Sequence, residues 1–433
     1  MKNSKLFQYI VIGLFIFFII VGAILFSTYK NNSAGDIQIS ITMWGTLPQT
    51  SFSSFSNPYF TDAKLKYTVN YIEKNPATFD QDLVEALASG SGPDAVILPQ
   101  DLIVRYANKI YPIPYAVLSE TIFKQTYVQE GELFLNSAGI MGLPFSIDPL
   151  VMYWNRDIFN NAGVTKPPVS WSDIAGLLPK MTKKDQAGNI LASTVALGEF
   201  RNINNAKEIL SALIIQLGNP LVIMNPDNTF TGVLNGNSNT NNSSASLALQ
   251  FYTNFSNPSK ATYSWNRSLP SALDSFANGD LAIYFGFASE YLTIKNKNPN
   301  LNFAVDALPQ IINAKVLNTF GNMLGFAIMK NSQNPGGAYT ILSSLTSAAA
   351  YPFSADVFNV SSARRDILGQ AEPNAIKSIF NKSAIISKGW LDPNKAETSA
   401  IFQDMIESYT TGKNNIDTAV NTASARLNGL LNQ

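Results

Sequence analysis

The chain has 433 residues, 46% of them hydrophobic and 11% aromatic, and its 30 Lys and Arg residues balance its 30 Asp and Glu residues. This length predicts two domains or a two-lobed body, and the hydrophobic content excludes disorder as the main state. The balanced charge gives no electrostatic support for nucleic-acid binding. His and Cys are both absent, which excludes disulfides and thiolate chemistry and removes the usual general base. Any catalysis would depend on carboxylates, Tyr, Lys or Ser, and we expect no cofactor and no metal.

Residues 6–29 form an apolar run without a charge. A membrane-spanning helix needs about 20 apolar residues, whereas the apolar part of a signal peptide has about 7–15. Lys2 and Lys5 precede the run and place the N-terminus in the cytoplasm and the body outside. The sequence therefore predicts a transmembrane anchor over 1–30 and a polar linker over 31–36. A cleaved export signal is the alternative, and under either interpretation the body works outside the cytoplasm.

The first part of the body alternates strands and helices. IQISITMW (37–44) is β-branched with alternating polarity and predicts a strand. Thr78 with Gln81 has the spacing of a capping box that opens a helix, and DAVIL (94–98) predicts a buried strand. Strand–helix–strand alternation implies a parallel sheet with covering helices.

The same alternation resumes at LVMYW (150–154), which predicts a short buried strand followed by a helix near 157–162. Gly163 ends that helix, and Ser170 with Asp173 predicts the N-terminal cap of the next one. Further helices are expected near 245–255, over 268–280, and over the amphipathic segments 397–411 and 415–430. Further strands are expected over 281–285, 301–308 and 325–330.

Six segments in fixed order resemble the extracellular solute-binding proteins of ABC importers, in the carbohydrate-type branch (family 1) that includes maltodextrin-binding protein. They are ITMW, SGPDAVIL, LPFSIDPLVMYWNRDIFNNAGVTKPPVSWSD, SFANGDLAIYFG, FGNMLGFAIMKNSQNPGGAY and TGKNNIDTAVNTASARLN. Each segment alone is a weak signal, whereas six in the family's order are a strong one. The resemblance extends over nearly the whole exported body.

The resemblance implies an α/β, two-lobed, periplasmic-binding-protein-like fold of type II, with a hinge and a ligand cleft between the lobes. It assigns residues 37–145 and 310–362 to lobe 1, and residues 146–309 and 363–433 to lobe 2. It also implies a binding protein rather than an enzyme, which delivers a carbohydrate or similar polar solute to ABC permease subunits. Closure around the ligand would be a hinge motion.

Sugars are recognised by aromatic faces and by carboxylates or amides that accept hydrogen bonds from hydroxyls. Trp44, at the end of the first strand, is either a core residue or a site residue. Adjacent side chains on a strand face opposite sides, so Tyr153 and Trp154 have different surroundings, and we assign Trp154 to the cleft. Trp265 and Trp390 lie on predicted loops, with surface exposure as the alternative for Trp265.

The resemblance also suggests polar candidates. Asp101 and Glu199 match family positions that carry ligand-binding acids, and Phe200 follows as a stacking residue. The alternatives are a helix N-cap for Asp101 and a solvated loop charge for Glu199. Asp148 is either a ligand contact or a turn residue of the hinge. Where relatives carry a Gly-Pro-Trp element this chain has Gly286-Phe287, so we expect Phe287 or Tyr284 to replace the tryptophan.

The chain departs from the maltodextrin-specific relatives at two places. Ser399 and Ala400 stand where those relatives have a Trp-Tyr pair, and Pro48 and Gln49 replace an acid–Lys pair. A smaller or different solute than maltodextrin is therefore expected. Two other functions are weighed: a glycoside-acting enzyme, which needs two carboxylates about 5–10 Å apart, and a surface sensor or adhesion protein with the same fold.

Overall fold

The computed structural model describes residues 39–60, 67–227, 229–236, 243–314, 316–351 and 360–432. The predicted anchor over 1–30 and the linker over 31–36 lie outside the described residues. None of the helices in these ranges is both long enough and apolar enough to cross a membrane.

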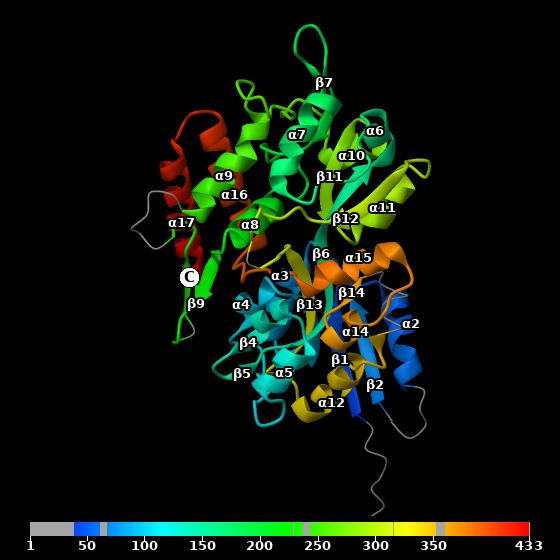
Figure 1. Ribbon diagram of the computed structural model, residues 1–433. Helices are drawn as coiled ribbons and strands as arrows, with labels where there is room; N and C mark the ends of the chain where they lie inside the picture. Colours follow the sequence, from blue (N-terminus) through cyan, green and yellow to red (C-terminus); the bar gives the residue numbers. More distant parts are fainter. Residues whose placement is uncertain are drawn as a thin grey trace, which may run out of the picture.

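One long strand, β6 (Leu143–Asn155), connects two bodies, which we call lobe 1 and lobe 2 (Figure 1). The sheet follows the order β2-β1-β3-β13-β6-β11-β8-β7, with β12 and β14 also paired to β6. In lobe 1, β1 pairs in parallel with both β2 and β3, so the predicted parallel arrangement is confirmed. In lobe 2, β11 pairs in parallel with β8 and antiparallel with β6.

Lobe 1 is a sheet covered by short helices. Its strands are β1 (Ile39–Gly45), β2 (Tyr67–Glu73), β3 (Ala95–Pro99), β4 (Leu135–Asn136), β5 (Gly139–Ile140), β13 (Gly321–Ile328) and β14 (Ser361–Ser362). Its helices are α2 (Gln49–Phe60), α3 (Phe79–Ala88), α4 (Leu102–Tyr106), α5 (Glu120–Thr126), η1 (Gln129–Phe134), α12 (Pro335–Leu345) and α14 (Arg365–Leu368). The alternation predicted for this part of the chain is confirmed.

Within the part of the chain that the structure describes, lobe 2 has more and longer helices than lobe 1. Its strands are β7 (Lys183–Lys184), β8 (Ile190–Val195), β9 (Val222–Met224), β10 (Phe230–Gly232), β11 (Leu281–Phe287) and β12 (Phe303–Ala307). Its helices are α6 (Arg156–Asn161), α7 (Trp171–Met181), α8 (Ala206–Gln216), α9 (Ser244–Thr253), η2 (Asn254–Ser256), α10 (Ala272–Asn278), α11 (Glu290–Lys297), α16 (Lys395–Thr410) and α17 (Ile416–Leu431). A further helix, α15 (Ala375–Ile385), lies between the lobes (Figure 1).

Each lobe has its own hydrophobic core. The first core includes Ile147 of β6, and the second begins at Leu150 of the same strand. The chain changes core again between Phe320 and Met323 at the start of β13. Helix α15 contributes to both cores. The polypeptide therefore passes between the lobes more than once, and short backbone segments join two separately packed bodies.

Helix ends follow local side-chain chemistry at most of the predicted positions. Ser170 accepts a hydrogen bond from the Asp173 amide while the Asp173 carboxylate accepts one from the Ser170 amide, so this predicted cap is confirmed. The capping box predicted at Thr78 is wrong, because the Thr78 side chain makes no cap hydrogen bond. Gly163 and Gly279 end their helices with φ of 66° and 86°, conformations that glycine adopts without a steric penalty.

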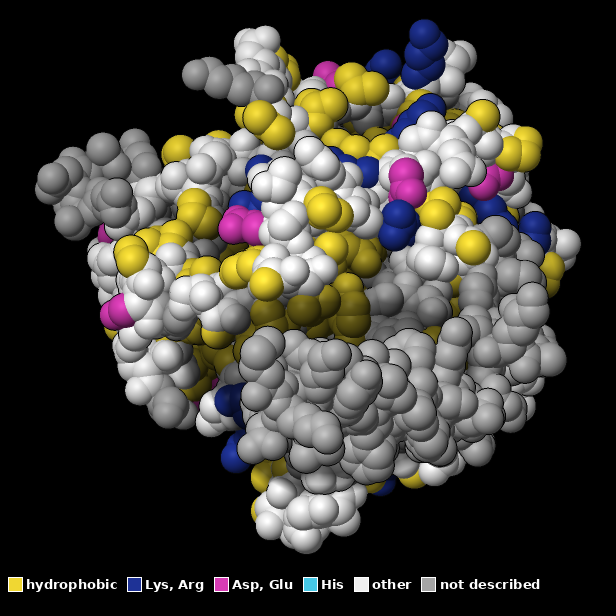
Figure 2. All heavy atoms as spheres, turned by 90° about the horizontal axis from the view of Figure 1, so that it is seen from below, with side chains coloured by type: hydrophobic (Ala, Val, Ile, Leu, Met, Phe, Trp, Pro, Cys, Tyr) yellow, Lys and Arg dark blue, Asp and Glu magenta, His cyan; other side chains and the backbone are white. Residues whose placement is uncertain are grey.

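The surface carries charges of both signs in small numbers. On the part of the lower face that the structure describes, Lys and Arg side chains are scattered among uncharged and acidic ones rather than gathered in a patch (Figure 2). This distribution agrees with the zero net charge of the chain. The described part of this face therefore does not concentrate positive charge in the way that attracts a polyanion.

Candidate ligand-binding site

The two lobes direct the carboxyl ends of their parallel strands toward each other. In lobe 1, β13 pairs antiparallel with β3, so that Leu324 opposes Pro99, and Gly321 at the start of β13 opposes Pro149 of β6. The carboxyl end of β3 therefore points toward the crossing of β6 between the lobes. In lobe 2, Phe287 at the carboxyl end of β11 opposes Leu150, on the other side of the same crossing. Open α/β sheets bind ligands at such strand ends.

The lobe 1 half of this junction contains Trp44 and Asp101. Trp44, at the end of β1, is 8% exposed, and the Lys74 ammonium lies 3.8 Å from the centre of its ring. Asp101 follows β3 and occupies the N-cap position of α4, but its side chain makes no cap hydrogen bond. Asp101 therefore has the position that the helix-cap alternative expects, but its side chain does not cap the helix.

The lobe 2 half contains a buried ion pair. Lys207, in the first turn of α8, is 4% exposed, and its Nζ atom lies 2.8 Å from Oδ2 of Asp392, which is 6% exposed. The Thr398 hydroxyl donates to the Asp392 carboxylate over 2.8 Å and accepts from Lys207 over 3.2 Å. Trp390 lies beside this network at the edge of the lobe 2 core; it is 4% exposed, and its ring is stacked on Phe402 and lies 5.8 Å from the Lys207 ammonium.

Electrostatic coupling connects the two halves. Burial raises the pKa of the Asp101 carboxyl above its ordinary value. The positive charge of Lys395 lowers the pKa, the negative charge of Asp392 raises it, and the positive charge of Lys207 lowers it. All three charged residues belong to lobe 2. The two halves meet beside these groups, because the backbone of Gly389, next to Trp390, lies against the side chain of Gln100, next to Asp101. We call this set, Trp44, Asp101, Lys207, Trp390 and Asp392, the interlobe site.

The crossing of β6 has its own polar contacts. Asp148 accepts a hydrogen bond of 3.0 Å from the Ser289 amide, which follows β11. Burial raises the pKa of Asp148 to about 6, and the nearby Glu290 carboxylate adds to this increase. Phe287 is 8% exposed and packs edge-on against Phe320, which precedes the return of the chain to lobe 1, with 6.4 Å between ring centres. Asp148 thus holds the crossing to lobe 2, as the hinge alternative expects.

Two of the proposed site residues, Glu199 and Phe200, make contacts within lobe 2. Glu199 is 7% exposed and its carboxylate pairs with the Arg267 guanidinium at 3.2 Å. The solvated-loop alternative for Glu199 is therefore wrong, and a ligand would have to displace Arg267 to reach both of its oxygens. Phe200, the next residue, is half-buried against the lobe 2 core.

Three aromatic assignments need correction. Trp154 opposes Ile283 on β11, four residues beyond Leu150, or about 13 Å along the strand from the crossing. It packs on Phe159 of α6, with 5.0 Å between ring centres. The strand was predicted to begin at residue 150, whereas β6 begins at Leu143, and Trp154 therefore lies near the far end of β6 from lobe 1. Trp265 is 1% exposed and donates from Nε1 to Asn202, so it is neither a site nor a surface residue.

Tyr284 is likewise a core residue. Its ring packs with Tyr153 and Phe276, and its hydroxyl donates to the Glu290 carboxylate. Glu290 also accepts 2.8 Å hydrogen bonds from the Asn205 side chain and the Phe287 amide. These hydrogen bonds fix the loop after β11. Tyr284 therefore stabilises the structure next to the junction and does not line the site.

Sequence reasoning missed Lys207 and Asp392. Lys207 lies within a helix whose other residues are almost all buried and apolar, and that context is the available signal, because a lysine there requires a partner. Asp392 follows Trp390 by two residues in the same loop, but its partner is 185 positions away. Spacing along the chain does not connect such residues.

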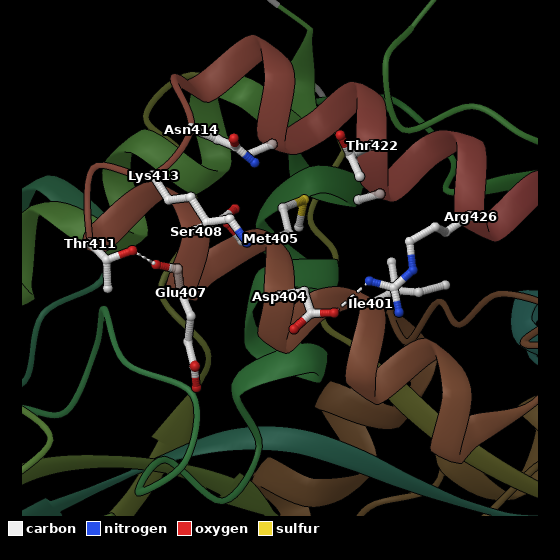
Figure 3. Close-up of a pocket in the computed structure, with 12 residues that line it drawn as sticks. Ile401, Asp404, Met405, Glu407, Ser408, Thr411, Lys413, Asn414, Thr422 and Arg426 are labelled. Atoms are coloured by element: carbon white, nitrogen blue, oxygen red, sulfur yellow. Dashed lines mark hydrogen bonds and ion pairs between the residues drawn. The ribbon is translucent and has the colours of Figure 1, made fainter.

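A separate hollow of about 380 Å³ lies between α16 and α17 (Figure 3). Its Arg426 and Asp404 side chains form an ion pair at 2.5 Å, and its Glu407 carboxylate pairs with Arg201 at 2.7 Å. These charges already satisfy one another, and both helices belong to lobe 2. The hollow therefore lacks a contribution from lobe 1, unlike the interlobe site.

The two cores, the repeated crossing of the chain and the facing strand ends together define a two-lobed binding protein. Residues 48–352 match the sequence model of the family described as bacterial extracellular solute-binding protein. Because this match covers more than half of the chain, the protein belongs to the bacterial extracellular solute-binding protein family.

Solved structures show the same fold. The chain is similar to the sugar-binding protein MalE from Xanthomonas citri, with a TM-score of 0.73 and 17% identity, covering 91% of this chain and 97% of that one. It is also similar to an ABC transporter solute-binding protein from Thermotoga lettingae TMO bound with alpha-D-tagatose, with a TM-score of 0.66, 18% identity, and coverage of 91% and 100%. At these identities the likeness establishes the fold alone, and it confirms the predicted two-lobed α/β architecture.

Among curated proteins, the chain is 20% identical over 167 residues to a chain from Brucella abortus (strain 2308) that is named as a binding protein. The match spans 36% of this chain and 38% of that relative.

Proposed function

We propose that this protein is the extracellular solute-binding component of an ABC importer and that it binds a carbohydrate or similar polar solute at the interlobe site. The observation that carries the proposal is the meeting of the two halves at this junction, where Gly389, next to Trp390 of lobe 2, lies against Gln100, next to Asp101 of lobe 1, with the Lys207–Asp392 ion pair beside Trp390. Carboxylates, an ammonium group and an aromatic ring from opposite lobes are the groups that bind hydroxylated rings. The sugar ligands in several of the similar structures support this class of solute.

Ligand binding closes the lobes by a hinge motion in this proposal. The crossing of β6 and the linkers near Phe320 and α15 are the segments that join two independent cores. A solute that contacts both lobes at once binds the closed arrangement more tightly than the open one, and that difference drives closure.

The N-terminal apolar run 6–29 anchors the body to the membrane in this proposal, with the N-terminus in the cytoplasm and permease subunits as partners. Sodium carbonate extraction of membranes tests the anchor. The full chain should stay with the membrane, and a chain that begins at residue 31, secreted by a cleavable signal, should be released. Release of the full chain would contradict the anchor but would leave the binding function standing.

The binding function is tested with a panel of mono- and oligosaccharides and with thermal unfolding as the readout. A ligand at 100 times its Kd adds about 2.7 kcal/mol to the free energy of unfolding. Isothermal titration then gives the affinity for the wild type, Trp390→Phe and Asp101→Asn. The proposal fails for carbohydrates if no sugar changes the unfolding temperature, and it fails for this site if both variants bind as the wild type does.

Closure is measured on a chain labelled at two introduced cysteines, because the natural chain has none. Exposed Glu85 in lobe 1 and Lys180 in lobe 2 are suitable positions. The distance between labels should change on ligand addition. An unchanged distance with saturated binding would show that binding occurs without closure.

A further inference from the structure

Glu130 places a carboxyl group inside the molecule. It belongs to η1 of lobe 1 and is 2% exposed. Both of its carboxyl oxygens are buried, and neither has a hydrogen-bond partner within the part of the chain that the structure describes. Burial of an ionised carboxylate without a partner is far more unfavourable than burial of the neutral acid. The arrangement around Glu130 therefore favours the protonated form of this side chain.

The carboxyl group lies against two segments that carry the chain between the lobes. Gly321 begins β13, where the chain passes from the lobe 2 core to the lobe 1 core, and Gly389 lies between α15 and the lobe 2 core. We call residues 319–321 and 386–389 the two linkers. A Cβ atom at Gly321 would overlap Oε2 of Glu130, and one at Gly389 would lie 2.6 Å from Oε1. The backbone of both linkers therefore contacts the carboxyl group, and glycine permits this approach.

Hydrogen bonds hold the linkers to each other and to lobe 1. The Lys388 amide donates to the Thr319 carbonyl over 2.9 Å, and this bond joins the two linkers. The Gln100 side chain, which follows β3, donates to the Gly321 carbonyl over 3.2 Å and accepts from the Met323 amide over 2.9 Å. The two linkers therefore form one unit that covers Glu130.

The surroundings of Glu130 contain no compensating charge within the described residues. The groups that face it from the packed elements are uncharged, namely Gln100, Gly321, Ser387 and Gly389. The titratable residues next to these positions in the chain and in η1 are Asp101, Lys388 and Glu132. None of these three contributes to the pKa of Glu130. Burial raises that pKa well above its ordinary value, and the amide group of Gln100 lowers it.

We propose that Glu130 is a proton-dependent positioning residue for the interlobe site. While the carboxyl group keeps its proton, both linkers stay packed on η1. Loss of the proton favours an arrangement in which the linkers move off η1 and water reaches the carboxylate. Because Gly389 precedes Trp390 and Gln100 precedes Asp101, this movement changes how the two halves of the interlobe site face each other. The inference rests on the proposed function only through the motion of the two lobes.

Protonation and packing of the linkers are coupled thermodynamically. The pKa of Glu130 is raised in the packed arrangement, and it returns toward its ordinary value of 4.5 once water reaches the group. The contribution of Glu130 to the packed arrangement is therefore fully present below that ordinary value and is lost as pH rises toward the raised pKa. Because one proton is involved, the ratio of the two arrangements changes by at most about tenfold per pH unit.

The distance between the lobes tests the proposal without any solute. Spin labels at Glu85→Cys and Lys180→Cys report this distance by double electron–electron resonance, because the natural chain has no cysteine. The labelled chain is compared with the same chain carrying Glu130→Gln, which keeps a neutral group of the same size. The two distance distributions should coincide at pH 5 and differ at pH 9. The comparison is made at each pH because Asp148, with a pKa of about 6, titrates in both chains.

The matched control is Glu132→Gln, which removes a half-buried carboxylate of η1 that pairs with Lys124. This variant should follow the labelled wild-type chain at both pH values. Three results would overturn the proposal: equal distributions for Glu130→Gln and the wild type at pH 9, a difference of the same size at pH 5, or the same departure from the wild type in Glu132→Gln. A sugar panel without any binding would contradict the proposed function and leave this measurement unaffected, since no solute is present in it.

Discussion

The two halves of the interlobe site differ in how their charges are satisfied. In lobe 2, Lys207 and Asp392 are buried together and share Thr398, so every charge has a partner within the same lobe. In lobe 1, Asp101 makes no cap hydrogen bond, and its main charge interactions come from the opposite lobe. The lobe 2 half is therefore preorganised, whereas in the proposed binding mode the lobe 1 half acquires its partners from the solute and from the facing lobe.

The largest expected effect is a decrease in the free energy of unfolding when the Lys207–Asp392 ion pair of lobe 2 is removed. Lys207→Met leaves the Asp392 charge buried without its cation, and such a loss is unfavourable by about 3–5 kcal/mol. Urea denaturation should show this decrease in the free energy of unfolding. Lys395→Met, at an exposed position of the same region, is the matched control and should change stability by less than about 0.5 kcal/mol. Equal effects of the two substitutions would show that the lobe 2 half is not preorganised.

Asp148, at the crossing between the halves, should make stability depend on pH. Its pKa is about 6 in the folded protein against an ordinary value of 3.8. Because the folded state holds this proton more tightly, the contribution of Asp148 to stability is greatest below about pH 4 and is lost as pH rises through 6. The difference corresponds to at most about 3 kcal/mol.

Asp148→Asn removes this titration but keeps an oxygen that can accept from the Ser289 amide. The variant should be more stable than the wild type at pH 7.5, by up to about 3 kcal/mol, and equal to it at pH 4. Denaturant unfolding at both pH values measures the difference. The exposed Asp280→Asn serves as the control. A gain of the same size at both pH values would exclude the carboxyl group as its cause.

The next largest effect is expected for Asp101, in the lobe 1 half of the interlobe site, and it concerns the affinity for the solute. Asp101→Asn keeps the size of the side chain but removes the charge, so the affinity for the transported solute should fall by roughly 10- to 100-fold. Stability should stay the same or rise, because burial disfavours the charged form of Asp101. Titration calorimetry and urea denaturation of one preparation measure both quantities. A fall in stability without a fall in affinity would place Asp101 in the structural framework instead.

The fold was predictable because its signals are local and ordered. The strand at 94–98, the capped helix after Ser170 and the glycine after α10 each depend on residues a few positions apart. The order of such segments carries the two-lobed architecture. The strand at LVMYW was also predicted, but its true start at Leu143 was not, because the preceding residues include two prolines, at 144 and 149.

The candidate site was less predictable because its contacts are distant in sequence. Lys207 and Asp392 are 185 positions apart, and Glu199 meets Arg267 across 68 positions. Neither pair leaves a pattern in one sequence. Alternation correctly separated Tyr153 from Trp154, since Tyr153 is fully buried and Trp154 is half-buried. It could not show which end of the strand lies at the junction, and this decides the role of Trp154.

The smallest expected effect is therefore at Trp154. Trp154→Phe should leave solute affinity unchanged, because the side chain packs on Phe159 about 13 Å from the crossing. Trp390→Phe, the matched tryptophan within the lobe 2 half, should weaken binding several-fold, since its ring lies beside Lys207. Calorimetry with one solute compares the two variants directly. If Trp154→Phe binds the solute more weakly than Trp390→Phe does, the solute binds near Trp154 on β6 and not beside the preorganised Lys207–Asp392 pair of lobe 2.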